Sequence, residues 1–145
     1  RLATPRLFDE NYKFEIGKGV ELKEGNDVTI VATGLMVNEA LIAAENLKAE
    51  GIEARVINIA TIKPIDKDII IKAAKETGVI VTAEEHSVIG GLGSAVAEVV
   101  VKNAPVKMAM VGQKDTFGES GKPDQLKEKY GMTAADSLAA VKGVL

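Results

Sequence analysis

The sequence predicts an α/β domain, built on a mostly parallel β-sheet with helices on both faces. Four short apolar runs rich in β-branched residues alternate with segments whose apolar residues recur every three to four positions. Such runs are typical of strands covered on both faces, and the intervening segments are typical of amphipathic helices. Parallel neighbours need crossover connections, so the alternation favours a sheet between two helix layers. The four runs are 28–32, 55–59, 79–83 and 106–111.

The first half of the chain places helices between these strands. Residues 13–22 alternate apolar and polar side chains around two glycines, which predicts a short antiparallel excursion before the first strand. A helix over 37–50 follows, with a glycine placed to end it. The next helix covers 66–77, with Asp66 as its expected N-cap and Gly78 as its end.

The second half repeats the alternation. After the third strand we expect a glycine-rich loop and an unusually apolar helix over 95–102. The fourth strand leads into a long polar loop, and a short helix over 123–130 follows. The last helix begins at Thr133, whose hydroxyl can cap the backbone while Asp136 lies three residues on, and it runs to Leu145.

Composition and charge narrow the classes of function. The 145 residues carry a net charge of −3 and give a pI of about 5.3, and a chain of this length is enough for one domain with its own core. The chain has no basic footprint and few aromatic residues, so we expect no nucleic acid as a partner. No apolar run approaches the roughly 18 residues of a membrane helix, so we expect no membrane partner. The lack of cysteine excludes disulfides and thiolate chemistry, and it is compatible with the cytoplasmic location that we expect.

A glycine-rich segment, GGLGS, follows the third strand and opens a helix. Exposed backbone amides and the helix dipole attract phosphate at such a position. The dinucleotide fingerprint, however, requires Gly or Ala where Val96 stands, and no Lys followed by Ser or Thr completes a P-loop. We therefore favour tight turning and close packing as the role of Gly90, Gly91 and Gly93, with contact to an anion as the alternative.

Glu84, Glu85 and His86 come directly after the third strand, where open α/β sheets tend to bind ligands. Carboxylates beside an imidazole can perform acid–base chemistry or hold a divalent metal. Adjacent residues of a strand point to opposite faces, however, so the two glutamates are not expected to share one site. A surface or capping role for the histidine competes with a catalytic one.

The loop DTFGESG, residues 115–121, combines acids, hydroxyls and an aromatic ring. Loops of this length in compact domains are often functional. The alternative is that Phe117 fills a hydrophobic gap while its neighbours cap the next helix. The GxSxG frame of a nucleophile elbow is missing, so a hydrolase is not favoured.

The chain opens with RLATPRLF, without an initiator Met or a signal peptide, and polar residues follow. Such a start is typical of a linker. We therefore expect residues 1–12 to be a linker from a preceding domain and residues 13–145 to form the domain itself, as one piece of a longer protein.

Five segments, in order, carry a resemblance to a known family. They are EIGKGVEL, VTIVATG, INIATIKPID, VTAEEHSVIGGLGSAVAEV and VGQKDTFGESGKPDQLKEKYGMT. Together they closely resemble the C-terminal domain of transketolase, above all the form in which the enzyme is split into separate N- and C-terminal chains. The resemblance implies a three-layer domain around a five-stranded, mostly parallel sheet with one antiparallel strand.

The resemblance also implies the activity of a whole enzyme. Transketolase transfers a two-carbon ketol unit between sugar phosphates in the pentose phosphate pathway, as a dimer that uses thiamine diphosphate and Mg. The family's GDG motif and its cofactor-activating Glu belong to other domains, and neither is present here. We therefore expect no catalytic, cofactor-binding or metal-binding residue in this chain, no cofactor bound to it, and no activity of the chain alone.

Its expected partners are the other transketolase domains or subunits and a dimer mate. In the family, the segment ahead of this domain ends in a strand with an Arg that contacts substrate phosphate, and Arg1 lies at or just past the end of that strand. We assign Arg1 no role.

The resemblance suggests that seven candidate residues shape an interdomain or anion-contacting edge. They are Glu84, Glu85, His86, Gly90, Gly91, Gly93 and Phe117. Three alternatives stay open: the C-terminal domain of a related thiamine diphosphate enzyme (deoxyxylulose phosphate synthase or a 2-oxoacid dehydrogenase β subunit), a regulatory module that binds a small ligand, and a small self-contained enzyme that uses Glu85 and His86.

Overall fold

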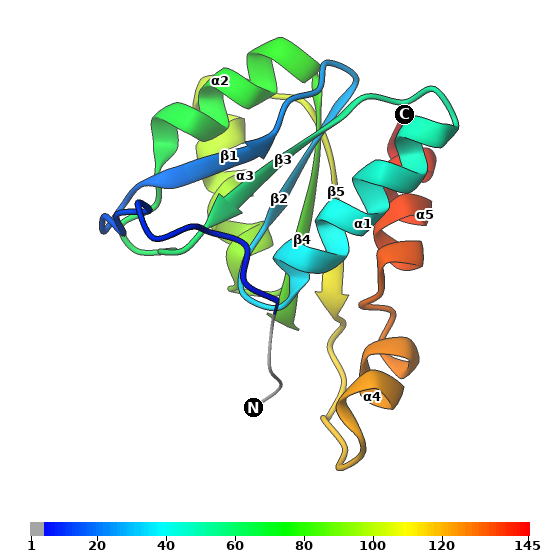
Figure 1. The fold of residues 1–145 in the computed structure, drawn as a ribbon. Coiled ribbons are helices and arrows are strands. Elements are labelled where there is room, and N and C mark those ends of the chain that lie inside the picture. The colour runs from blue at the N-terminus through cyan, green and yellow to red at the C-terminus, as the bar shows by residue number, and fades with distance from the viewer. Residues whose placement is uncertain (1–4) are drawn as a thin grey trace.

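A computed structural model describes residues 5–145 and confirms the predicted α/β architecture. One sheet holds five strands in the order β1-β3-β2-β4-β5, in which β1 runs antiparallel to β3 and the other neighbouring pairs are parallel. Arg1 and the first residues of the predicted linker lie outside the described residues. The strands are β1 (Gly19–Lys23), β2 (Val28–Ala32), β3 (Ala54–Ile59), β4 (Val79–Ser87) and β5 (Lys107–Gln113) (Figure 1).

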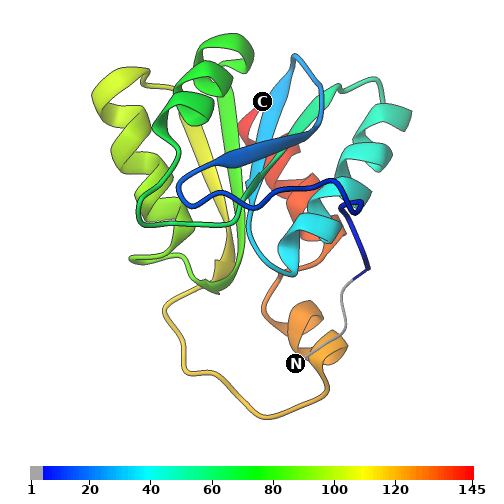
Figure 2. The same cartoon turned by 60° about the vertical axis from the view of Figure 1, so that its left-hand side comes forward.

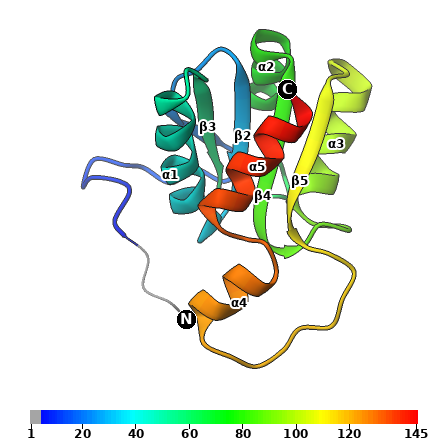
Figure 3. The same cartoon turned by 90° about the vertical axis from the view of Figure 1, so that its right-hand side faces the viewer.

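Helices cover both faces of this sheet. The helices are α1 (Met36–Ala49), α2 (Lys67–Thr77), α3 (Leu92–Asn103), α4 (Pro123–Lys129) and α5 (Ala134–Val144). The pair α1 and α5 packs on one face and the pair α2 and α3 on the other (Figures 1 and 3). The short helix α4 and the loop before it extend beyond the sheet (Figure 2).

The core consists of two apolar clusters, one on each face. Because successive strand residues point to opposite faces, Val56 of β3 packs toward α1 whereas its neighbour Ile57 packs toward α2 and α3. The same alternation holds in β4, where Ile80 and Val81 belong to different clusters. This explains why the strands read as continuous apolar runs in the sequence.

The caps predicted from the sequence are confirmed. The Asp66 carboxylate accepts the N–H of Ile69 at the start of α2, and Gly78 ends that helix with a φ of 71°. Thr133 and Asp136 form a reciprocal capping box at the start of α5. No helix within residues 5–145 has both the length and the apolar character needed to cross a membrane.

Three element boundaries differ from the prediction by three residues or more. The predicted excursion over 13–22 forms a strand only from Gly19 onward, and that strand ends at Lys23. Before it, Gly17 has a φ of 79° and its N–H donates to the Thr61 hydroxyl instead of to the sheet. Strand β4 continues past Ala83 to Ser87, since its register shifts and Ser87 then pairs with Gln113. Helix α3 begins three residues earlier than predicted.

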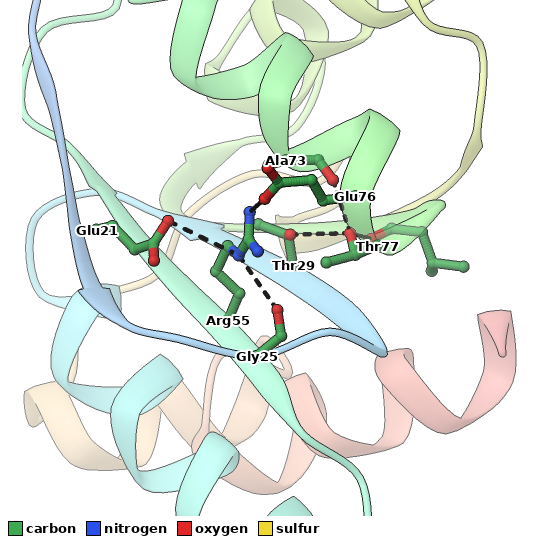
Figure 4. Close-up of polar contacts among 8 residues, drawn as sticks. Glu21, Gly25, Thr29, Arg55, Ala73, Glu76 and Thr77 are labelled. Atoms are coloured by element: carbon green, nitrogen blue, oxygen red, sulfur yellow. Dashed lines mark hydrogen bonds and ion pairs between the residues drawn. The ribbon is translucent and has the colours of Figure 1, made fainter.

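The amino-terminal edge of the sheet is closed by an ion-pair network around Arg55 (Figure 4). The Arg55 guanidinium donates to the Gly25 carbonyl at 3.2 Å and to the Glu76 carboxylate at 2.5 Å, and it lies 3.7 Å from the Glu21 carboxylate. Its side chain is buried, and a buried charge is tolerated only when it is paired in this way. These contacts join β1, β3 and α2, so this edge contributes to stability.

Candidate functional site

A cavity of about 740 Å³ lies at the opposite edge, beside the carboxyl ends of β2, β3 and β4. The chain leaves β2 through α1 to reach β3 on one side, and then returns through α2 to β4 on the other side. The strand order therefore reverses at β2. Open α/β sheets tend to bind ligands in the crevice at such a switch point.

Glu84 lies at this edge but faces α3. The residue is 1% exposed. One of its carboxylate oxygens accepts the N–H of Leu92 at 2.7 Å, and the other accepts the N–H of Gly93 at 2.8 Å. The negative carboxylate thus satisfies the first amides of α3 and complements the helix dipole. This bonding also explains why α3 begins at Leu92.

The glycines of the predicted anion loop pack closely around this carboxylate. A Cβ on Gly91 would lie 2.0 Å from the Glu84 carboxylate, and one on Gly93 would lie 2.7 Å from the Met110 sulfur. Gly90 has a φ of 76°, which side-chain-bearing residues rarely adopt. The structure accounts for all three glycines by turning and close approach, and a protein carboxylate already occupies the helix terminus where an anion was the alternative.

Glu85 and His86 are both exposed and line the cavity. The His86 ring lies 3.1 Å from the Ser87 carbonyl, and among the described residues no hydrogen bond joins it to Glu85. Within residues 5–145, no group of three or more His, Asp or Glu side chains could hold a metal ion. We therefore assign no acid–base pair and no metal site here.

Phe117 is 98% exposed, so the interpretation that it fills a hydrophobic gap is wrong. The loop around it is nonetheless held in place: the Tyr130 hydroxyl donates to the Phe117 carbonyl at 3.2 Å, and the Gln113 amide donates to the Thr116 carbonyl at 3.0 Å. An aromatic ring presented to solvent on a fixed loop is suited to contact with another protein surface.

Sequence reasoning missed Asn58, which also lines the cavity. Asn58 is 8% exposed, and among residues 5–145 its side-chain amide forms no hydrogen bond. The available signal was a single amide within the apolar, β-branched run of β3.

Comparisons with known proteins identify the family. Residues 17–136 match the family described as "Transketolase, C-terminal domain". The chain belongs to the transketolase C-terminal domain family. The relatives of this domain include a 6-deoxy-6-sulfo-D-fructose transketolase subunit from Clostridium sp. (strain MSTE9), which is 52% identical over 144 residues. Another is a putative transketolase C-terminal section from Methanocaldococcus jannaschii, 51% identical over 125 residues.

Two solved structures resemble this transketolase C-terminal domain. One is a split gene transketolase described as an inactive β4 tetramer, with a TM-score of 0.95 and 55% identity over 98% of this chain and 46% of its own. The other, the transketolase from Leishmania mexicana, has a TM-score of 0.66 at 22% identity over 88% of this chain and 18% of its own, which supports the fold alone.

The chain is shorter than these relatives. The alignment with the Clostridium subunit covers 99% of this chain and 45% of the subunit. The alignment with the Methanocaldococcus protein covers 86% of this chain and 39% of that protein. The chain thus spans less than half the length of these curated relatives.

Proposed function

We propose that this chain is the C-terminal domain of one component of a split transketolase, an enzyme that transfers a two-carbon ketol unit between sugar phosphates. The observation that carries the proposal is the agreement with the split gene transketolase over 98% of the chain, at 55% identity. In this proposal residues 1–12 are the linker from a preceding domain, and residues 13–145 form the domain that packs against it. The pentose phosphate pathway, a cytoplasmic location and a dimeric whole enzyme belong to the same proposal.

The domain's part in the enzyme is to dock onto the rest of it. Large apolar side chains are exposed near the carboxyl edge: Ile62 follows β3, Ile89 follows β4 and Phe117 follows β5. Phe14 and Ile16 join them, because the first residue of β1 pairs with the last residue of β3. Several large apolar side chains exposed along one edge of a domain are typical of an interaction site.

Pro5, Leu7 and Phe8 lie at the same edge and line its cavity. The partner we assign to this edge is the remaining part of the enzyme, which in the relatives makes up more than half of the chain.

The cofactors of the whole enzyme, thiamine diphosphate and Mg, are proposed to bind to its other parts. A diphosphate–metal site needs several convergent oxygen ligands. Within the described residues no acidic cluster offers them, and the buried Glu84 carboxylate is already engaged by two backbone amides. We therefore propose that the residues of this chain take no direct part in the chemical reaction.

A comparison of the whole enzyme with this chain tests the proposal. The complete protein, purified with its partner component, should transfer a ketol unit from a ketose phosphate to an aldose phosphate when thiamine diphosphate and Mg are present. The chain alone should show no transfer and no calorimetric binding of thiamine diphosphate with Mg. Saturable binding by the chain would contradict the assignment.

Two matched substitutions test the docking edge. Ile89 and Val101 are 66% and 68% exposed, but Ile89 lies at the carboxyl edge whereas Val101 lies on α3. In the complete protein, Ile89→Ser should weaken assembly, measured by co-purification and sedimentation, and Val101→Ser should leave it intact. Equal effects of the two substitutions would show that the edge is not the interface.

A second candidate is a 1-deoxy-D-xylulose-5-phosphate synthase. The relative of that name from Heliobacterium modesticaldum is 47% identical over 131 residues, which are 90% of this chain and 20% of the relative. The product distinguishes the two: formation of 1-deoxy-D-xylulose 5-phosphate by the complete enzyme, without ketol transfer between sugar phosphates, would favour the synthase.

A further inference from the structure

The N-terminus of α1 differs from the other long helix N-termini in the described part of the chain. Asp66 accepts an amide at the start of α2, Glu84 does so for α3, and the Thr133–Asp136 capping box together with Glu39 does so for α5. Leu35, the N-cap of α1, supplies no side-chain acceptor. By itself this difference does not define a site.

The second observation is Asn58. Its side chain is on the face of β3 that carries Val56 and therefore faces α1, because residues two apart in a strand share a face. It is more than nine-tenths buried and lines the cavity together with five residues of the approach to α1 and its first turn, Thr33, Gly34, Leu35, Val37 and Asn38. An amide side chain that is mostly buried, forms no hydrogen bond within residues 5–145 and borders a cavity is placed to bind a polar ligand group there.

Residues with further donor groups line the same cavity. The backbone N–H groups of Gly34 and Leu35 donate to no other described residue, and Asn38 of the first helical turn also lines the cavity. Backbone amides at a helix N-terminus favour a negative ligand group. The Glu84 carboxylate is turned to α3, so Glu85 is the exposed negative charge on the rim.

We propose that this cavity binds an oxyanion group, such as the phosphate of a phosphorylated small molecule, at the N-terminus of α1 with Asn58 as a donor. The cavity volume of about 740 Å³ lies in the range of small-molecule sites. Gly90 and Gly91 of the glycine-rich motif border the same cavity, but the first amides of α3, those of Leu92 and Gly93, already donate to Glu84. The site does not depend on the proposed transketolase activity, because the donors all belong to this chain.

The test titrates the ¹⁵N-labelled chain with inorganic phosphate. Saturable shifts of the Gly34 and Leu35 amides are expected. Asn58→Asp places a negative charge in the cavity and should weaken binding by about tenfold or more, since a hydrogen bond to a charged group is lost. The matched control is Asn46→Asp, on the exposed surface of α1, which should leave the affinity unchanged.

Glu85→Gln provides a second, independent arm. Removing the rim charge should tighten phosphate binding several-fold if the ligand group is an anion. This arm decides the question if thermal unfolding shows that Asn58→Asp does not fold. The proposal is overturned by a lack of saturable shifts at Gly34 and Leu35, by binding that Asn58→Asp leaves unchanged, or by binding that Glu85→Gln does not strengthen.

Discussion

The N-termini of α3 and α1 lie at the same edge of the sheet but are satisfied in opposite ways. At α3 the protein supplies its own anion, because Glu84 accepts the amides of Leu92 and Gly93. At α1 no side chain of residues 5–145 caps the helix, and the terminus opens into a cavity beside Asn58. The glycine-rich motif therefore lies at the closed terminus, that of α3, where the protein supplies the acceptor. The open terminus, that of α1, follows the turn at Thr33 and Gly34, which has no recognisable anion-binding motif. A motif that suits an anion does not reveal whether the protein already provides that anion.

The largest loss of stability is expected when the cap of α3 is removed. Glu84→Ala leaves two buried N–H groups without an acceptor and should lower the free energy of unfolding by about 2–4 kcal/mol. Glu84→Gln should lower it less, since its amide oxygen still accepts one hydrogen bond. Urea unfolding measures both. Glu85→Ala, at the exposed neighbour, should change it by no more than about 0.5 kcal/mol. A Glu84→Ala protein as stable as the parent would mean that the cap is dispensable.

A slightly smaller effect is expected when the same terminus is crowded. The Cβ added by Gly91→Ala would lie 2.0 Å from the Glu84 carboxylate and 2.5 Å from the Ser87 carbonyl. The displacement this requires should cost about 1–3 kcal/mol in urea unfolding. Gly143→Ala is the matched control, since a Cβ there meets no atom within 4 Å and alanine favours the helix. If both variants unfold alike, the packing around Gly91 is looser than the contacts indicate.

At a third helix N-terminus, that of α5, the stabilising contacts include an ion pair whose contribution depends on pH. The Glu39 carboxylate accepts the N–H of Ala134 at 3.0 Å and pairs with Lys127 at 2.8 Å. Its hydrogen bond raises the pKa of Lys127 above the ordinary value of 10.5. The pair's contribution to stability is therefore fully present below pH 10.5 and is lost as the pH rises through the raised pKa.

Glu39→Gln should cost about 1 kcal/mol near neutral pH, and its difference from the parent should shrink above pH 10.5. Unfolding in urea over a pH series measures this. Glu50→Gln, at the half-exposed pair with Lys142, is the control and should show a smaller cost. A difference between Glu39→Gln and the parent that stays constant over the whole series would exclude the ion pair as its source.

The smallest expected effect is at the open terminus. Asn58→Val removes a buried amide that has no described partner and places a β-branched residue in a strand, so stability should change by less than about 0.5 kcal/mol or increase slightly. Thermal and urea unfolding of the chain without added ligand provide the measurement. A loss as large as that of Glu84→Ala would show that Asn58 has a structural partner and that the two termini are equally closed.

Most of the fold could be predicted from local patterns. The apolar runs located the four parallel strands, and Asp66, Gly78 and Thr133 marked helix ends through chemistry that acts within a few residues. The boundaries that could not be predicted depend on distant contacts: Gly17 turns out of the sheet toward Thr61, and α3 starts early because Glu84 lies across from it.

The candidate site was only partly visible in the sequence. The sequence indicated the strand end at Glu84–His86 and the separation of the two glutamates, because alternation along a strand is a local property. It gave no reason to expect that Glu84 caps α3, that Phe117 is exposed, or that Asn58 borders a cavity. Each of these depends on which segments meet at the edge.

By itself the sequence determined the alternation of strands and helices, most of the helix caps and the family resemblance, since these depend on residue types at short spacings. Only the tertiary structure decided which helix terminus is occupied by the protein's own carboxylate and which remains open. The physical reason is that a hydrogen bond or a cavity depends on atoms brought together across the sheet. Asn58 and Leu35 are 23 positions apart in the chain, yet they line one cavity.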